Sequence, residues 1–297
     1  MSRFLASELP DLPPKDCLFH VIPVPHEATV SYGGGTAKGP TAIIEASNQL
    51  EVWTGETNPG IYGIYTWPAV VCDPCDIPAT MAAIAKATTT AMSAGPQRVI
   101  PVLLGGEHSI TFGALKALCT HYGHFGVIHF DAHADLRDTY ENTPYSHACV
   151  MRRASDDLRL PLFQVGVRSL SPEEAVYRQE NNIPHLDARE FARRGGMAWL
   201  LGYAGSILPD NFPNRVFLTF DVDALDASIM PATGTPEPGG LSWWEALALV
   251  RACLSGREVL GFDVTETAPI EGFTAPTFTA ARLVYELMAE TCPHTIR

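Results

Sequence analysis

The sequence predicts an α/β protein with a mostly parallel central sheet and helices on both of its faces. Short runs that are apolar nearly throughout recur along the chain and alternate with segments of helical character. Strands of that composition are buried on both faces, which is typical of parallel sheets covered by helices. Of the 297 residues, 46% are hydrophobic, enough for a large core and too many for a disordered chain. Because no repeat, linker or change of composition divides the chain, we expect a single domain over residues 1–297.

Six apolar runs are the predicted strands. Each is short and bounded by polar residues, Gly or Pro, as buried strands usually are. The runs are Leu18–Ile22, Val99–Leu104, Gly126–Phe130, Leu162–Val167, Val216–Phe220 and Val259–Phe262.

Four segments between these runs have helical features. Pro78–Ala94 is rich in Ala and Met, and Thr111–Cys119 follows Ser109, a residue type that often caps a helix. Ser171–Glu174 has the pattern of a capping box with Pro at the first helical position, and it predicts a helix to about Gln179.

The second capping box is Ser242–Glu245. Gly256 stands where a glycine would end the helix that this box begins. We expect the two tryptophans inside the box to pack on the sheet.

The charge balance restricts the class of partner. The chain has 20 Lys and Arg against 33 Asp and Glu, a formal net charge of −13. Nucleic acids are bound largely through Lys and Arg, so this balance disfavours them and favours a small cationic substrate.

Cysteine usage and the N-terminal segment indicate a cytoplasmic protein. The 7 cysteines are scattered without a disulfide framework, which is typical of a reducing compartment. Cys72 and Cys75 have the spacing of half a zinc site, but no second pair completes it, so we expect loop cysteines. The segment up to Cys17 lacks the apolar core of a signal peptide, and we expect no membrane span.

Polar side chains follow three of the predicted strands. They lie in Gly105–Ser109, Asp131–Asp135 and Asp221–Asp223. In open α/β sheets, ligands bind at the carboxyl ends of the strands, so these segments are expected to share one crevice. The strand period of two would point the acidic and imidazole side chains of each segment the same way.

Four convergent carboxylates would repel one another without a countercharge. Two divalent cations would cancel that charge, and ligands that are all N or O suit Mn²⁺ or a similar first-row ion. Solvated loop acids are the simpler interpretation of any single motif. The three motifs together favour a metal pair.

These motifs resemble those of the ureohydrolases, the family of arginases and agmatinases, and within it the agmatinases most. The segments that carry the resemblance read GGEHS from Gly105, HFDAHADL from His129, TFDVDALDAS from Thr219 and FDVTE up to Glu266. The resemblance implies a three-layer α/β/α arginase-like fold, a homo-oligomer (trimer or hexamer) and two Mn²⁺ per subunit.

The resemblance also implies the ligands of each ion. Asp131 and Asp221 would bridge both ions. His108, Asp131, Asp135 and Asp221 would hold one ion, and His133, Asp131, Asp221 and Asp223 the other.

A mechanism follows from this ligand set. Paired metal ions lower the pKa of a shared water, so that hydroxide is available near neutral pH to attack a guanidinium carbon. Asp135 would pass the proton to the departing nitrogen. Glu266 matches the family glutamate that clamps the guanidinium by charge-assisted hydrogen bonds. His147 matches a loop histidine that shuttles protons or supports the leaving group.

Agmatine, cleaved to putrescine and urea, is the expected substrate. Val167–Ser171 lacks the acidic residue that would meet the α-amino group of arginine. Arg137 is expected to turn outward to Asp138 or Glu141; if it faced the pocket, it would favour a carboxylated substrate such as guanidinobutyrate. Guanidinobutyrate, guanidinopropionate and, less favoured, arginine are therefore the alternative substrates. The loop Met230–Gly240 is expected to form a pocket wall.

Two other classes of function stay open. A metal-binding scaffold without activity would lack the clamp or the proton carrier, whereas Glu266 and Asp135 are both present. A phosphoesterase would need Lys or Arg around the ions, and Arg137 alone stands near a motif. His129 is expected to lie in the core or beside the ligands rather than to be a ligand.

Overall fold

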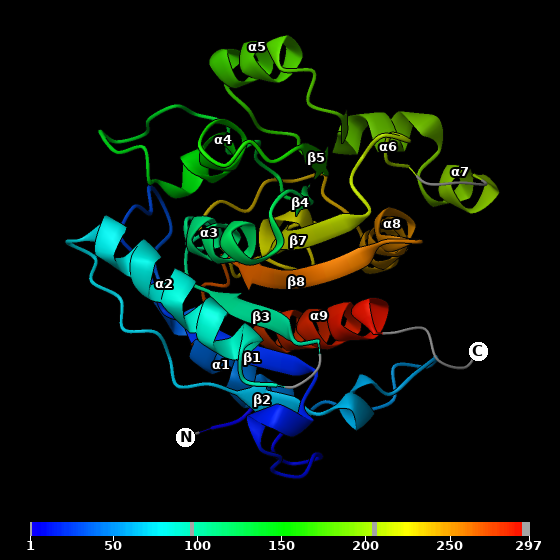
Figure 1. Cartoon of the computed structure of the whole chain (residues 1–297). Coiled ribbons are helices and arrows are strands. Elements are labelled where there is room, and N and C mark those ends of the chain that lie inside the picture. The colour runs from blue at the N-terminus through cyan, green and yellow to red at the C-terminus, as the bar shows by residue number, and fades with distance from the viewer. Residues whose placement is uncertain (1, 96–97, 204–206, 293–297) are drawn as a thin grey trace.

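The computed structural model describes residues 2–95, 98–203 and 207–292, which contain eight strands. The strands are β1 (Phe19–Val24), β2 (Ile64–Thr66), β3 (Ile100–Gly105), β4 (Gly126–Phe130), β5 (Leu162–Val165), β6 (His185–Leu186), β7 (Arg215–Asp221) and β8 (Glu258–Thr265). All neighbouring strands are parallel, and the order across the sheet is β2-β1-β3-β8-β7-β4-β5-β6 (Figure 1).

The described residues also form nine α-helices. They are α1 (Gly39–Ser47), α2 (Ile77–Met92), α3 (Ile110–Tyr122), α4 (Val150–Asp156), α5 (Pro172–Glu180), α6 (Ala188–Arg194), α7 (Met197–Gly202), α8 (Trp243–Leu254) and α9 (Ala275–Thr291). Helices α1 and α6 to α9 share one hydrophobic core with the sheet, and α2 to α5 share a second core. Neighbouring strand residues such as Val102 and Leu103 point into opposite cores. The predicted three-layer α/β/α fold is confirmed.

All six predicted strands are present, with small shifts of their ends. Strands β2 and β6 lie outside the prediction because three and two residues are too few to form a recognisable apolar run. Helices α1, α4, α6, α7 and α9 also lie outside the predicted segments.

The predicted capping boxes begin α5 and α8, and Gly256 follows α8 with φ +72°. Ser109 occupies the position before α3, as expected, but its side chain makes no capping hydrogen bond. The Ser109 hydroxyl donates to Glu107 (2.6 Å) and not to the helix end. Trp243 packs on the core, but Trp244 is 71% exposed, so the prediction that both pack on the sheet is wrong for Trp244. Their neighbouring positions on α8 point in different directions.

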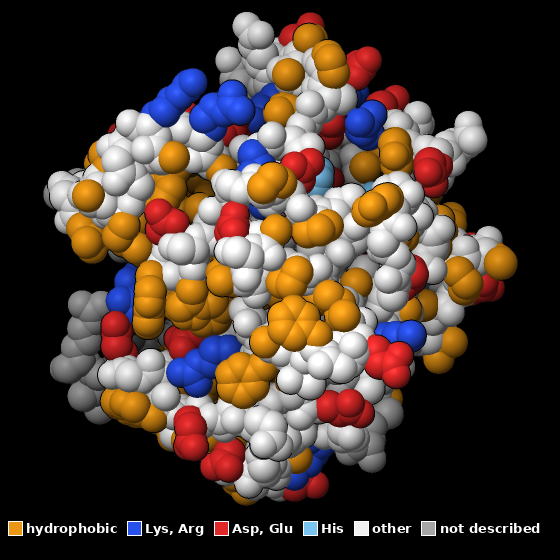
Figure 2. All heavy atoms as spheres, turned by 180° about the vertical axis from the view of Figure 1, so that it is seen from behind, with side chains coloured by type: hydrophobic (Ala, Val, Ile, Leu, Met, Phe, Trp, Pro, Cys, Tyr) orange, Lys and Arg blue, Asp and Glu red, His pale blue; other side chains and the backbone are white. Residues whose placement is uncertain are grey.

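One face of the molecule carries hydrophobic side chains gathered near its middle, among scattered acidic and basic ones (Figure 2). Tyr32, Ile61, Val71 and Trp244 are among the large hydrophobic residues that are more than two-thirds exposed. Across the described ranges, no helix combines the length and the hydropathy needed to cross a membrane.

Four adjacent central strands, β3, β8, β7 and β4, end at the same edge of the sheet. Strands β3 and β4 follow each other in the sequence but are not neighbours in the sheet. Between them lie β8 and β7, which come from the last third of the chain. Crevices for ligands form where the strand order changes in this way. This edge is therefore where the polar segments meet.

Candidate metal centre

The loop after β3 carries His108 to this edge, and Gly106 allows the approach. A side chain at Gly106 would put its Cβ 1.9 Å from the carbonyl oxygen of His26, while the Glu107 amide donates to that oxygen (2.9 Å). Only glycine therefore lets the end of β3 lie against the segment after β1.

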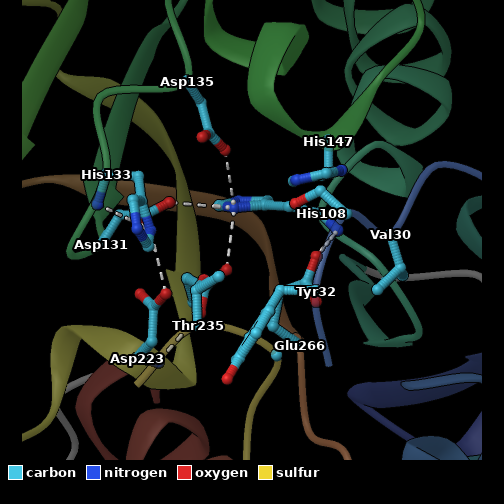
Figure 3. A pocket seen from close by; sticks show the side chains of 13 residues that line it. Val30, Tyr32, His108, Asp131, His133, Asp135, His147, Asp223, Thr235 and Glu266 are labelled. Carbon is cyan, nitrogen blue, oxygen red and sulfur yellow. Dashed lines mark hydrogen bonds and ion pairs between the residues drawn. The ribbon is translucent and has the colours of Figure 1, made fainter. Parts of the chain in front are cut away.

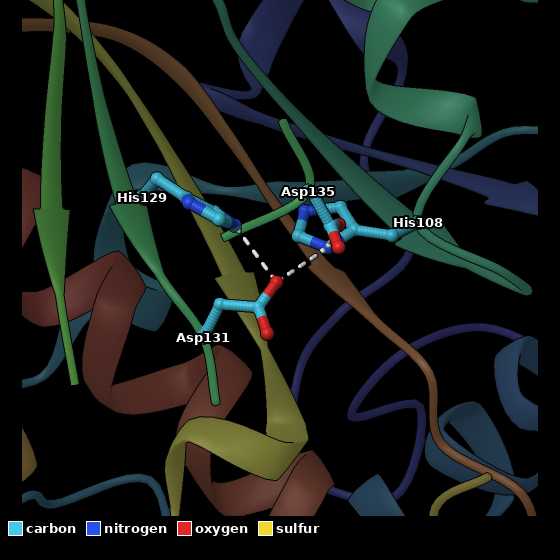
Figure 4. A group of neighbouring side chains, drawn as sticks. All are labelled: His108, His129, Asp131 and Asp135. Atoms are coloured by element: carbon cyan, nitrogen blue, oxygen red, sulfur yellow. Dashed lines mark hydrogen bonds and ion pairs between the residues drawn. The ribbon is translucent and has the colours of Figure 1, made fainter. Parts of the chain in front are cut away.

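His108 lies at the centre of a first cluster of ligand atoms (Figures 3 and 4). Its buried Nδ1 makes no hydrogen bond in the described structure. Three carboxylate oxygens surround that atom, from Asp131 at 3.1 Å, Asp135 at 3.3 Å and Asp221 at 3.2 Å. Atoms that bind one divalent ion at about 2.1 Å lie about 3 Å from each other, so this spacing fits a metal ion among them.

A second cluster shares Asp131. His133 Nδ1 lies 3.0 Å from a carboxylate oxygen of Asp223 and 3.5 Å from one of Asp131. The other carboxylate oxygen of Asp131 faces His108. Asp131 thus joins two groups of potential ligands.

The predicted reason for this convergence is wrong in part. The strand period does not orient Asp135, because β4 ends at Phe130 and Asp135 has a left-handed backbone, φ +52°. Nor does it orient Asp223, which lies in a short 3-10 turn (Val222–Ala224) after β7. There the Asp221 carboxylate accepts a hydrogen bond from the Asp223 amide (2.9 Å). Turns, and not continued strands, bring these carboxylates inward.

The acid–base properties of the clusters indicate that positive charge would stabilise their carboxylates. Burial and the charge of Asp131 raise the pKa of Asp135 to about 7. Burial and neighbouring carboxylates also raise the pKa of Asp221 well above its usual range. Burial alone would lower the pKa of His133, but Asp131 and Asp223 raise it to about 12. Because the carboxylates cannot all ionise together without countercharge, the donor set fits bound cations.

Buried hydroxyl groups orient His108 from behind. Its Nε2 lies 2.7 Å from the Thr219 hydroxyl, so Nδ1 is the nitrogen left to bind an ion. The Thr111 hydroxyl lies 3.4 Å from that of Thr219 and donates to Asp263 (2.7 Å).

His129 orients Asp131 in a similar way. Its Nε2 donates to Asp131 (2.8 Å), and its Nδ1 accepts from the Gln164 amide (3.0 Å). His129 lies close enough to the first cluster to be a metal ligand. Both of its ring nitrogens are hydrogen-bonded, however, so it fits its expected place beside the ligands.

A pocket of about 360 Å³, open to solvent, lies over the two clusters (Figure 3). Its described lining contains no Lys or Arg. The lining residues are Val30, Ser31, Tyr32, His108, Asp131, His133, Asp135, His147, Asp221, Asp223, Gly234, Thr235 and Glu266. The lining includes all eight residues that the sequence singles out for metal binding or catalysis.

Glu266 follows β8 in a left-handed conformation, φ +64°, which is uncommon for a residue with a long side chain. Its carboxylate accepts a hydrogen bond from the His108 amide (2.6 Å). Burial, and then the charge of Glu107, raise its pKa well above the usual range. A cationic ligand would stabilise the ionised form.

His147 enters the pocket from the loop after β4. Its Nδ1 lies 3.1 Å from the Thr29 hydroxyl, which also accepts a hydrogen bond from the His147 amide (3.1 Å). Burial lowers the pKa of His147, which favours a neutral ring.

The predicted ion pair of Arg137 is wrong. Its nearest carboxylate is Glu174, at 3.9 Å, while Asp138 is bound by Arg153. Glu174 is held near Arg137 by the capping box of α5 and by the Leu136 amide. Arg137 also lies over the Tyr140 ring and does not line the pocket.

The predicted pocket wall is confirmed, since Gly234 and Thr235 of the loop Met230–Gly240 line the pocket. Gly33 touches this loop so closely that a Cβ there would lie 2.8 Å from the Gly234 oxygen. Cys72 and Cys75 lie in the loop before α2 and belong to neither ligand cluster found in the described residues.

The family model for the arginase family matches residues 18–289. The chain belongs to the arginase family. Enzymes of this family depend on two metal ions, and this arginase-family enzyme is a ureohydrolase of the agmatinase type, acting on guanidino C–N bonds.

Individual relatives agree with this family. An N(1)-aminopropylagmatine ureohydrolase of Synechocystis sp. is 40% identical over 92% of this chain and 89% of its own. An agmatinase of Pyrococcus horikoshii is 31% identical over 95% of both chains. The solved structure of an agmatine ureohydrolase of Thermoplasma volcanium superposes with a TM-score of 0.82, at 27% identity, over 98% of this chain and 94% of that one.

Two further residues of this arginase-family chain stand close to the pocket and were not predicted from its sequence. Glu107 lies inside a recognised motif, but the sequence does not show which residues its carboxylate contacts. Thr29 gives no signal in the sequence, because it meets His147 only through the fold.

Proposed function

We propose that the chain hydrolyses the guanidinium group of agmatine to putrescine and urea. Two divalent ions, preferably Mn²⁺, would bind at the two clusters. The observation that carries the proposal is the pair of ligand groups joined by Asp131 beneath a pocket without Lys or Arg in its described lining. His108, Asp131, Asp135 and Asp221 would hold one ion, and His133, Asp131, Asp221 and Asp223 the other. When bound, the ion pair supplies a hydroxide nucleophile near neutral pH.

Glu266 would bind the substrate guanidinium. One of its oxygens accepts from the His108 amide, which fixes the carboxylate at the edge of the cluster. The remaining acceptor positions suit the N–H groups of a guanidinium in a charge-assisted pair. This pairing would place the guanidinium carbon over the ligand clusters, where a nucleophile can reach it.

Asp135 and His147 would move protons. As water adds to the guanidinium carbon, Asp135 would take the released proton and return it to the alkyl nitrogen, so that this nitrogen leaves as an amine. His147 lines the same pocket (Figure 3) and would exchange protons with solvent during the same step.

The charge of the pocket supports a cationic chain attached to the guanidinium. Arg137 pairs with Glu174 outside the lining, so it offers no partner to a substrate carboxylate. This favours agmatine over guanidinobutyrate, guanidinopropionate and arginine.

N(1)-aminopropylagmatine is a second candidate substrate. Relatives of that name are 40% and 34% identical to this chain, above the 31% of the agmatinase from Pyrococcus horikoshii. The pocket is open to solvent beside Tyr32, which is 86% exposed, so a longer amine could extend out of it.

Urea release with Mn²⁺ from a panel of agmatine, N(1)-aminopropylagmatine, guanidinobutyrate, guanidinopropionate and arginine tests the proposal. We expect kcat/KM to be highest for one of the two guanidinoamines. Arg137→Ala should leave that preference within about threefold, because the side chain is turned away from the pocket. Preferred hydrolysis of guanidinobutyrate, lost in Arg137→Ala, would overturn the assignment.

We also propose that the enzyme is a cytoplasmic homo-oligomer, a trimer or hexamer, with residues 1–297 as one domain. The hydrophobic side chains gathered on one face support association, because exposed apolar patches commonly mark contacts between proteins (Figure 2). Sedimentation velocity at several concentrations tests the assembly, and a monomer at every concentration would contradict it.

A further inference from the structure

Glu107 is completely buried beside the pocket and accepts four hydrogen bonds. One of its oxygens accepts from the amides of Ala28 (2.6 Å) and Thr29 (2.7 Å). The other accepts from the hydroxyls of Thr29 (2.9 Å) and Ser109 (2.6 Å). With donors on both oxygens, Glu107 acts as a pure acceptor at this position.

This arrangement decides where the hydroxyl proton of Thr29 points. A hydroxyl has a single proton, and the Glu107 carboxylate can only accept, so the proton of Thr29 is donated to Glu107. The oxygen of Thr29 must then accept from its other two neighbours, the amide and the Nδ1 of His147, both at 3.1 Å. Consequently Nδ1 of His147 carries a proton.

We propose that Glu107 and Thr29 are positioning residues that hold His147 as its Nδ1–H tautomer, with Nε2 unprotonated and available to the pocket. The inference rests on the proposed function, because His147 matters to the reaction only if it exchanges protons there. Figure 3 shows the His147 ring pointing into the pocket.

The tautomer determines what His147 can do. A neutral ring with a free Nε2 can accept a proton in the pocket and release it again, whereas the opposite tautomer presents only a donor. Burial lowers the pKa of His147 and so favours the neutral ring on which this choice depends. The Ser146 hydroxyl lies 3.4 Å from Nδ1, a longer and weaker contact than the 3.1 Å contact of Thr29.

Replacing Thr29 tests the proposal. Thr29→Val removes the hydroxyl with little change of shape, Thr29→Ser keeps it, and Thr88→Val is a matched control that removes a buried hydroxyl bonded only within α2. In Thr29→Val we expect kcat for the best guanidino substrate to fall at least about 10-fold, with KM and bound metal unchanged. Thr29→Ser should restore kcat to within about threefold, and Thr88→Val should leave it unchanged.

The tautomer itself is read by long-range ¹H–¹⁵N spectra of ¹⁵N-histidine-labelled enzyme, loaded with diamagnetic Zn²⁺ or Cd²⁺ and compared with His147→Asn for assignment. Wild type, Thr29→Ser and Thr88→Val should show the Nδ1–H form of His147, and Thr29→Val a shift toward the Nε2–H form. An unchanged tautomer in Thr29→Val, or equal loss of kcat in Thr29→Ser, would overturn the inference. Absence of urea from every guanidino substrate would overturn the proposed function instead, and the tautomer would still be measurable.

Discussion

Glu266 is a buried carboxylate without a Lys or Arg partner in the described lining of the pocket. Glu266→Gln keeps an acceptor for the His108 amide but removes the charge that would face a guanidinium. We expect both metal ions to remain bound while kcat/KM falls by an amount equivalent to roughly 2–5 kcal/mol of lost transition-state binding. Metal analysis and steady-state kinetics measure the two effects. Near-normal kcat/KM would show that Glu266 is not the clamp.

Thr219 has a predictable effect on metal affinity because it touches His108 on the side away from the ligands. Thr219→Val should weaken metal binding roughly 10- to 100-fold, since His108 loses the partner that fixes its orientation. Thr219→Ser should retain most of the affinity. Competition with a chromogenic chelator measures both variants, and equal affinity of Thr219→Val and wild type would exclude this role.

At the residue level, the sequence predicts which types of side chain line the pocket, but not the residues that hydrogen-bond to these side chains and orient them. Asp131, His133 and Asp223 could be found because they stand in compact motifs directly after apolar runs. The contacts of Thr29 with His147 and of Thr219 with His108 join positions more than 100 residues apart. No local pattern encodes such pairs.

The loop that forms the pocket wall is held by Asp226. Its carboxylate accepts from the amides of Ser228, Gly239 and Gly240, which closes the loop onto the turn after β7. Arg168 adds hydrogen bonds to the carbonyl oxygens of Asp223 (2.7 Å) and Glu237 (2.8 Å). The wall is therefore tied to the segment that carries a proposed metal ligand.

Asp226 makes this loop sensitive to acid. Its hydrogen bonds, that of Ser228 first, lower its pKa to about 2, below the value of about 3.9 in an unfolded chain. The stabilisation is thus complete above about pH 4 and is lost as the pH falls toward about 2. Asp226→Asn should lower the free energy of unfolding by about 1 kcal/mol at pH 7.

Urea unfolding at a series of pH values measures this effect. The difference between wild type and Asp226→Asn should shrink as the pH falls below about 4. A difference that stays constant down to the lowest pH at which the protein folds would contradict the assignment.

Strands, helices and turns differ in how far their local sequence determines where they begin and end. The strands that lead to the pocket are recognisable because burial on both faces leaves them apolar throughout. Capping boxes locate the starts of α5 and α8 because their hydrogen bonds are local. The turns at Asp135 and Asp223 are not recognisable, because an alternating pattern of residues does not show where a strand ends and a turn begins.

The order of the strands is a property of the whole molecule. Strand β8 lies between β3 and β7, so Glu266 stands beside the His108 loop, although 158 residues separate them. A sequence pattern indicates a parallel sheet, but long-range packing selects one order of its strands. The shared crevice could be expected from the fold class. That Glu266, after β8, lies in this crevice is known only from the structure or from a family resemblance.

Metal binding should stabilise the whole molecule. The buried carboxylates of the clusters repel one another until cations bind, and an ion that binds only the folded state adds about 2.7 kcal/mol at 100 times its Kd. For a chain of this size that corresponds to a rise of roughly 5 °C in Tm. Differential scanning calorimetry with and without Mn²⁺ checks this, with Asp131→Asn as the variant that should show a much smaller rise. An equal rise in both proteins would place the ions elsewhere.

A titration of metal-free protein with Mn²⁺, followed by urea release from agmatine and N(1)-aminopropylagmatine, tests the central claim most directly. Two ligand clusters joined by Asp131 predict that activity rises until about two ions are bound per chain and is abolished again by a chelator. Asp131→Asn should lose more activity than Asp223→Asn, because Asp131 belongs to both clusters. Full turnover by the metal-free protein, or full activity with one ion per chain, would contradict the account.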